Sequence, residues 1–330
     1  MPDLRRNARV TLVAAPVALV LVAAGCGGAK ETASADAPSA SSFPDPAGKT
    51  LEQIAQEGEQ AEAAVAPTES VFSPGKNRYG FGVFSVDGKQ IDDAEVALYA
   101  SQPGKPAIGP FPAAVASLTT APAYASATTT DDPEAASAVY TTNVTFPRKG
   151  KWQVLAMIRN DDGSFGYSAA GPPVNVGAPN DIPDVGDPAP KIHTPTADDV
   201  GGDLTKIDTR RPSDDMHDVD FADALGKEPV VLLFATPALC QSRVCGPVVD
   251  IAEEVKNNRP DDAAFIHMEI YEDNQPDAEQ PDNNARSQVT DFGLQSEPWL
   301  FVIGSDGKVS TRIEGAFSED ELNAALNKVS

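Results

Sequence analysis

The chain has 330 residues, a formal net charge of −24 at pH 7 and 41% hydrophobic residues, together with 29 prolines and 25 glycines. This length suggests about two domains plus additional segments, and the hydrophobic fraction is sufficient for buried cores, whereas the proline and glycine content indicates long connections. So acidic a chain repels nucleic acid and anionic lipid, which excludes a polyanion-binding function.

The first 25 residues have the pattern of an export signal. Three arginines precede an apolar run at residues 10–24, which is too short for a comfortable membrane span. The run ends in Val-Ala-Ala-Gly-Cys, which resembles the lipobox of bacterial lipoproteins, although Ala23 stands where Leu is more usual. The resemblance implies cleavage before Cys26, lipidation of Cys26 and a stable anchor on the extracytoplasmic face of the cell membrane. The alternative is an ordinary cleaved signal with an incidental cysteine.

Residues 26–69 are predicted to be a disordered tether that follows the lipid anchor. Up to about Pro67 the segment consists mainly of Ala, Ser, Gly, Pro, Glu and Gln, with almost no bulky apolar residue. Such a composition buries too little surface to offset the entropy of ordering. A transient helix could form near residues 50–63, but Leu51 and Ile54 alone are not expected to dock it.

Residues 70–177 are predicted to form an all-β domain. Tyr79 and Phe81 fall on one face of an alternating strand, and Asp-Gly at residues 87–88 marks a hairpin turn. About seven short strands with regular turns suggest an immunoglobulin-like sandwich. Residues 101–137 are rich in Ala, Thr and Pro, are long for a structureless loop, and are expected to be mobile.

After a linker at residues 178–184, the segment 185–330 predicts a mixed α/β domain. Residues 230–234 are apolar on both faces, as a buried parallel strand must be. Beyond Pro247, apolar residues recur at the spacing of one helical face. A strand at residues 263–270, a later β-hairpin and a capped final helix complete an α/β sandwich with a mixed sheet.

Cys240 and Cys245 lie where the buried strand gives way to the helix. An even pair of cysteines in an exported chain favours an oxidisable couple over lone thiols. Within a regular helix, the two residues would be separated by about 7.5 Å along the axis, which exceeds the roughly 7 Å Cα limit for a disulfide. A bond therefore requires Cys240 to lie in the loop before the helix, or the first helical turn to be distorted. The helix N-terminus favours thiolate over thiol.

Three segments of this domain resemble the thioredoxin family. Residues 291–302, Asp-Phe-Gly-Leu-Gln-Ser-Glu-Pro-Trp-Leu-Phe-Val, resemble the segment around the family's cis-proline. Residues 304–326 resemble its last hairpin and helix, and residues 185–190 resemble the opening of the redoxin branch. The resemblance implies a thioredoxin-like fold in which Pro298 is cis and faces Cys240.

The chain also departs from the family pattern. Thioredoxins place two residues between their cysteines, whereas this chain places four. Leu233 replaces a buried acid of thioredoxin, and Pro237 occupies the position of the threonine in the peroxiredoxin pattern. Glu297 is expected to raise the pKa of the thiols, and Arg243 to lower it.

Two hypotheses about function follow from the cysteine pair. In a thiol–disulfide oxidoreductase, Cys240 would attack as thiolate, Cys245 would resolve the mixed disulfide and Pro298 would align the partner's chain. The partners would be exported proteins with thiols or disulfides, and no cofactor is implied. In a non-catalytic binding module, the Cys240–Cys245 pair would be a structural disulfide.

A third hypothesis is copper delivery in the manner of the Sco family. Cu(I) prefers soft thiolates, and His267 or Met268 could complete a site with the cysteines. His267 lies in the middle of a strand, however, and is more typical of an ordinary sheet residue, while His193 and His217 lie in poorly defined loops. The acidic residues of segment 272–282 lack EF-hand spacing, so a solvated loop is expected there.

Overall fold

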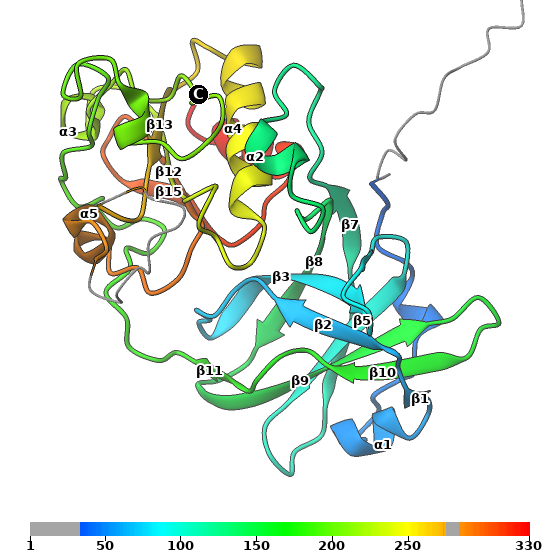
Figure 1. Ribbon diagram of the computed structural model, residues 1–330. Coiled ribbons are helices and arrows are strands. Elements are labelled where there is room, and N and C mark those ends of the chain that lie inside the picture. Colours follow the sequence, from blue (N-terminus) through cyan, green and yellow to red (C-terminus); the bar gives the residue numbers. More distant parts are fainter. Residues whose placement is uncertain (1–33, 273, 275–283) are drawn as a thin grey trace, which may run out of the picture. The chain divides into compact units, whose positions relative to one another are not determined.

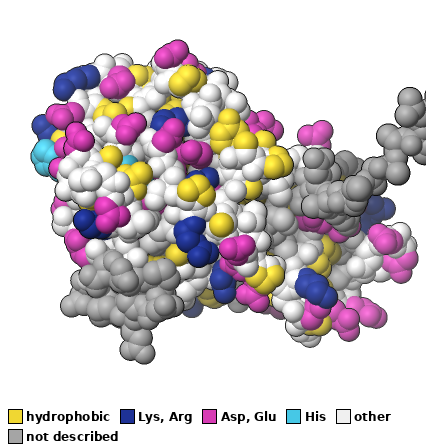
Figure 2. Space-filling view, turned by 45° about the horizontal axis from the view of Figure 1, so that its top comes forward, with side chains coloured by type: hydrophobic (Ala, Val, Ile, Leu, Met, Phe, Trp, Pro, Cys, Tyr) yellow, Lys and Arg dark blue, Asp and Glu magenta, His cyan; other side chains and the backbone are white. Residues whose placement is uncertain are grey.

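The computed structural model describes residues 34–272, 274 and 284–330, which belong to one compact unit containing a β domain and a mixed α/β domain (Figure 1). The predicted export signal and Cys26 lie outside the described residues, as does most of the acidic segment 272–282. Within the described ranges, no helix has the length and apolar character needed to cross a membrane. On the face shown in Figure 2, acidic side chains are dispersed with Lys and Arg between them.

The first domain is a sandwich of two β-sheets. The first sheet has the order β2 (Ala63–Pro67), β3 (Gly75–Ser85), β8 (Ala138–Phe146) and β7 (Ala114–Ser117), with β4 (Gln90–Ile91) paired to β3. The second has the order β1 (Glu59–Gln60), β10 (Phe165–Ala169), β9 (Gly150–Arg159), β5 (Glu95–Ser101) and β6 (Ile108–Pro112), with β11 (Val174–Val176) paired to β9. Both sheets contribute to one core, in which Phe81 from the first sheet and Trp152 from the second are buried. An all-β domain is therefore present, and its strands begin at Glu59, before the predicted start at residue 70.

The predicted tether differs from the structure from residue 34 onward. A short 3₁₀ helix, η1 (Ala40–Ser42), precedes helix α1 (Leu51–Ala55), which begins with a capping box. Leu51 and Ile54 are buried in a small cluster with Tyr99 on the outer face of the second sheet. Two apolar residues suffice because the sheet supplies an apolar partner surface, and β1 and β2 extend the two sheets. The prediction of a disordered tether was wrong for this part.

The segment at residues 101–137, predicted to be a mobile structureless loop, contains strands β6 and β7 and helix α2 (Ala127–Thr130). Strand β6 pairs with β5, and β7 pairs with β8. The Ala, Thr and Pro composition of the segment did not predict these strands, because they form by pairing with β5 and β8, which lie outside it. The expectation of a structureless loop was therefore wrong.

The second domain is built on a four-stranded mixed sheet with the order β13 (Ala264–Met268), β12 (Val230–Phe234), β14 (Trp299–Ile303) and β15 (Val309–Glu314). Strand β12 is parallel to β13 and antiparallel to β14, and β14 forms a hairpin with β15. Helices α4 (Cys245–Asn258) and α6 (Glu319–Leu326) pack on one face, and α3 (Phe221–Ala224) and α5 (Ser287–Asp291) on the other, with η2 (Leu204–Lys206) in a preceding loop. The predicted mixed α/β architecture is confirmed, and it is consistent with a thioredoxin-like fold.

Polar side chains join the two domains. The Arg78 side chain pairs with Glu69 of its own domain and, at 2.6 Å, with Glu321 of α6. Glu314 at the end of β15 accepts hydrogen bonds from the backbone N–H of Ser70 at 2.8 Å and from its hydroxyl at 2.6 Å. The side chain of Glu69 is only 6% exposed, so its charge depends on Arg78 for compensation.

We expect Arg78→Ala to lower the free energy of unfolding by about 3 kcal/mol, because it leaves a buried carboxylate without its partner. Urea unfolding followed by tryptophan fluorescence measures this loss. Arg159→Ala is the matched control, since its pair with Glu95 has side chains 40% and 46% exposed, and its loss should be below about 1 kcal/mol. Equal losses of stability in the two variants would show that Arg78 does not compensate the buried charge of Glu69.

Candidate functional site

The two cysteines form a disulfide at the start of α4. Their Cα atoms are 5.9 Å apart. Cys245 is the first residue of the helix, and Cys240 lies in the turn before it. This is the arrangement that the spacing of the cysteines required. The Cys240 sulfur also lies 3.2 Å from the hydroxyl of Ser242.

The two cysteines differ in their exposure to solvent. Cys245 is fully buried among the apolar residues beneath α4, whereas Cys240 is 7% exposed. Cys240 also lines two clefts, one shared with the β domain and one shared with Tyr271, Leu294 and Glu297. A reacting group can therefore approach Cys240 but not Cys245.

Glu297 lies beside the disulfide, and Pro298 follows it in the chain. The Glu297–Pro298 peptide bond is cis, as the family resemblance implied. A carboxylate oxygen of Glu297 and both cysteine sulfurs lie within 4.8 Å of one another. Burial, and then the nearby charge of Glu269, raise the pKa of Glu297 to about 8. The site therefore contains a carboxyl group that holds its proton near neutral pH.

Arg243 was expected to lower the pKa of the thiols, but its charge is compensated by the β domain. Its guanidinium lies 2.8 Å from a carboxylate oxygen of Asp132 and 3.4 Å from one of Glu134. Because the positive charge of Arg243 is neutralised by these two carboxylates, we expect Arg243 to have little effect on the pKa of the cysteine thiols. The sequence did not reveal this pairing because the acids lie more than 100 residues before the arginine.

The segment of residues 126–136, which includes α2, packs against the first turns of α4. The Ser126 backbone N–H donates to Asp250 of α4 at 3.0 Å, and the Ala136 N–H donates to the Arg243 carbonyl at 3.0 Å. A Cβ atom on Gly246 would lie only 2.7 Å from the Thr129 hydroxyl. This segment therefore forms one wall of the cleft that contains Cys240.

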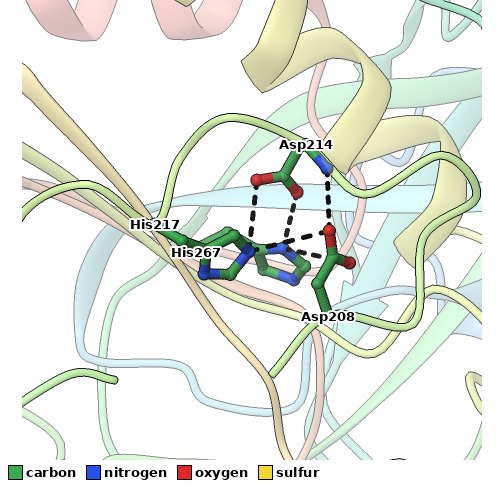
Figure 3. Close-up of side chains that lie close together, drawn as sticks. All are labelled: Asp208, Asp214, His217 and His267. Carbon is green, nitrogen blue, oxygen red and sulfur yellow. Dashed lines mark hydrogen bonds and ion pairs between the residues drawn. The ribbon is translucent and has the colours of Figure 1, made fainter. Parts of the chain in front are cut away.

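The histidines considered for copper do not surround the cysteines. His267 and His217 lie together with Asp208 and Asp214 in a buried cluster (Figure 3). Burial disfavours charge on His267, but the carboxylates of Asp214, Asp208 and Glu269 together outweigh burial and raise the pKa of His267 to about 10. Among the residues that the structure describes, the possible ligands grouped with the two sulfurs include Glu297 and no histidine.

The other copper candidates are also occupied elsewhere. Met268 is buried in the core on the opposite face of the sheet from α4. His193 is largely exposed, and its Nδ1 lies 2.6 Å from Asp220. His267 lies in strand β13 as expected, but its ring also pairs with Asp214, which the sequence did not predict. The only signal in the sequence for the cluster is the short spacing of Asp214 and His217.

Comparison with known proteins identifies a structural similarity but no related sequence family. No protein-family model matches the chain, and no curated protein matches it. Among solved structures, it is similar to a thiol:disulfide interchange protein, a thioredoxin family protein from Chlorobium tepidum TLS, with 17% sequence identity and a TM-score of 0.28. The match covers 43% of this chain and 94% of that chain.

We expect Glu297→Gln to lower the pKa of the Cys240 thiol in the reduced protein by about 1 unit, because the Glu297 carboxyl group is ionised above its own pKa of about 8 and then disfavours a second negative charge nearby. The pH dependence of alkylation by iodoacetamide measures this pKa. Glu319→Gln on the exposed start of α6 is the control and should leave the profile unchanged. An unchanged profile in the Glu297 variant would show that the carboxyl group does not act on the thiol.

We expect Asp132→Ala to increase the rate at which dithiothreitol reduces the disulfide by several-fold, because the variant releases Arg243 from the wall of the cleft. Asp131→Ala is the neighbouring control, since Asp131 is exposed and lies 3.7 Å from Arg211. The rate is followed by thiol titration of quenched samples. A rate equal to that of the unaltered protein would mean that the wall does not limit access to Cys240.

Proposed function

We propose that the chain is a membrane-anchored, extracytoplasmic thiol–disulfide oxidoreductase of the thioredoxin-like class. The observation that carries the proposal is the disulfide at the start of α4, in which Cys240 lines a cleft while Cys245 is fully buried. Anchoring through a lipid on Cys26 is part of the proposal and rests on the lipobox-like sequence. The partners are exported proteins with thiols or disulfides.

In the reducing direction, the Cys240 thiolate attacks a partner's disulfide, and one partner sulfur leaves as thiolate. The Cys245 thiolate then attacks Cys240 in the mixed disulfide and releases the second partner thiolate. The partner gains two electrons and the Cys240–Cys245 bond re-forms. In the oxidising direction the same steps run in reverse, and Cys245 is the group that leaves, as a thiolate stabilised by the N-terminus of α4.

Glu297 is suited to exchange a proton during these steps. Leu233 stands where thioredoxin has a buried acid, so a proton acceptor must come from another element. Glu297 has a carboxylate oxygen near both sulfurs and a pKa raised by burial to about 8. A group whose pKa lies close to the working pH is the most effective proton acceptor and donor.

We also infer that the β domain is of the immunoglobulin-like class. This inference is supported by its strand orders, β2-β3-β8-β7 and β10-β9-β5-β6. Read in chain order, they correspond to the ABED and GFC sheets of immunoglobulin domains, with β6 and β1 added at the two edges of the second sheet. In this reading, the segment of residues 126–136 is an insertion of the β domain that shapes access to the disulfide.

A structural disulfide in a non-catalytic binding module is the second candidate. It is favoured by burial, since Cys245 is inaccessible and Cys240 is only 7% exposed. The two candidates differ in reduction potential. Structural disulfides in secreted proteins have potentials below about −300 mV, and catalytic ones have higher values.

The decisive experiment measures the reduction potential in glutathione or dithiothreitol buffers, together with insulin reduction. We expect a potential above about −300 mV and measurable turnover of insulin. Cys240→Ser should have neither a reducible disulfide nor turnover, because the Cys240–Cys245 bond cannot form. Cys245→Ser should instead accumulate a mixed disulfide through Cys240, because the resolving thiol is missing.

Cys26→Ser is the matched cysteine control. It should keep full turnover while moving the protein from the membrane fraction to the soluble fraction. A potential below about −300 mV without turnover would exclude the oxidoreductase and favour the structural disulfide.

A further inference from the structure

Four ionisable side chains meet in a buried cluster at the end of β13 (Figure 3). They are Asp208, Asp214, His217 and His267, each no more than 2% exposed. One nitrogen or oxygen atom from each lies within 4.8 Å of all the others. Three of the residues come from the loop that precedes α3, and the fourth comes from the sheet.

The loop folds around its own carboxylates. Asp208 accepts hydrogen bonds from the backbone N–H groups of Arg210 and Asp214, both at 2.7 Å. Asp214 accepts from the N–H of Met216 at 2.9 Å, and the His267 N–H donates to the Met216 carbonyl at 3.0 Å. These bonds hold both carboxylates in place and attach the loop to the edge strand β13.

The orientation of His267 is set by the end of strand β12. Its Nε2 lies 3.1 Å from the carbonyl oxygen of Ala235. A carbonyl can only accept, so Nε2 carries the hydrogen, and Nδ1 faces Asp214 at 2.7 Å and Asp208 at 3.8 Å. A backbone carbonyl that orients an imidazole in this way is the usual outer contact of a metal-binding histidine.

His217 brings a nitrogen that the protein leaves unpaired. Its Nε2 lies 3.3 Å from Asp214 Oδ1 and 3.7 Å from Asp208 Oδ2, yet it is buried and makes no hydrogen bond with any protein atom. A buried polar atom without a partner is destabilising by about 1–3 kcal/mol. A ligand held between the two carboxylates and this nitrogen would satisfy it.

We propose that this cluster binds a divalent transition-metal cation of the zinc class through His217 Nε2, His267 Nδ1 and one oxygen each of Asp208 and Asp214. Imidazole nitrogens and carboxylate oxygens are zinc ligands at about 2.0–2.1 Å, which places tetrahedral ligands ~3.3 Å apart. His217 Nε2 lies 3.3 Å from Asp214 Oδ1 and 3.7 Å from Asp208 Oδ2, and His267 Nδ1 lies 3.8 Å from Asp208 Oδ1. His267 Nδ1 and Asp214 Oδ2 are closer, at 2.7 Å, so the ion would replace the proton of this hydrogen bond and move the two atoms apart. The two carboxylates balance the two positive charges of the ion.

The chemistry of the donors narrows the choice of ion. Magnesium and calcium prefer all-oxygen sites, and Cu(I) prefers sulfur, so a mixed nitrogen and oxygen set favours zinc or a similar divalent transition metal. The full burial of the ligands is typical of a structural site. The Thr209 hydroxyl accepts a hydrogen bond from the Ala238 N–H at 3.1 Å, so an ion that fixes this loop also fixes the turn leading to Cys240.

The test is a titration of the full chain with Zn²⁺ against a competing chromophoric chelator, after removal of bound metals. The disulfide is kept closed so that the thiols cannot bind the ion. We expect one tightly bound equivalent, and a first shell of nitrogen and oxygen by X-ray absorption with no sulfur at about 2.3 Å. His217→Gln should weaken binding by at least about 100-fold.

His193→Gln is the matched control, because this histidine is exposed on Asp220 away from the cluster. Zinc should raise the Tm of the unaltered protein and of this control but not of His217→Gln. The proposal is overturned if the unaltered protein has no tight site, if the first shell contains sulfur, or if His217→Gln binds as tightly as the control. If His217→Gln does not fold, Asp214→Asn replaces it, and the titration of the unaltered protein still decides the question.

Discussion

The burial of strand β12 is the constraint on which the rest of the second domain depends. All five of its residues are buried, and its two neighbours β13 and β14 pair with it along its full length. A strand paired on both sides and covered on both faces cannot shift its register without exposing apolar side chains. The position of its last residue is therefore fixed, and so is the start of the turn that follows it.

Both candidate sites are built on that fixed end. The carbonyl of Ala235, directly after β12, orients His267 of the buried cluster. A few residues later the same turn carries Cys240. Thr209 connects the two regions, since its N–H donates to Glu269 and its hydroxyl accepts from Ala238. The cluster supports the turn from within the protein, and the disulfide lies on its outer side.

The β domain takes part in the site. Its segment of residues 126–136 contacts α4 through Asp250 and the cysteine turn through Arg243. Charge is balanced across the contact between the domains, as in the pairing of Arg78 with Glu69 and Glu321. An acidic chain can bury the carboxylate of Glu69 because the guanidinium of Arg78 lies beside it.

Much of the second domain follows from local patterns in the sequence. The apolar run of β12, the helical spacing after Pro247 and the capping box of α6, with Ser318 and Glu321, all lie where the pattern placed them. The cysteine spacing showed that a disulfide requires either Cys240 in the loop before the helix or a distorted first turn, and the structure has Cys240 before the helix. The position of Glu297 beside the sulfurs and the cis bond before Pro298 were implied by the resemblance to thioredoxins.

Other features were decided only by the tertiary structure. Leu51 and Ile54 dock because the second sheet presents Tyr99 on its outer face, and strands β6 and β7 form because β5 and β8 pair with them. Asp208 and Asp214 join His267 from more than 50 positions away in the chain. Periodicity and composition describe a residue's near neighbours along the chain, whereas these contacts depend on surfaces that exist only once distant segments have packed together.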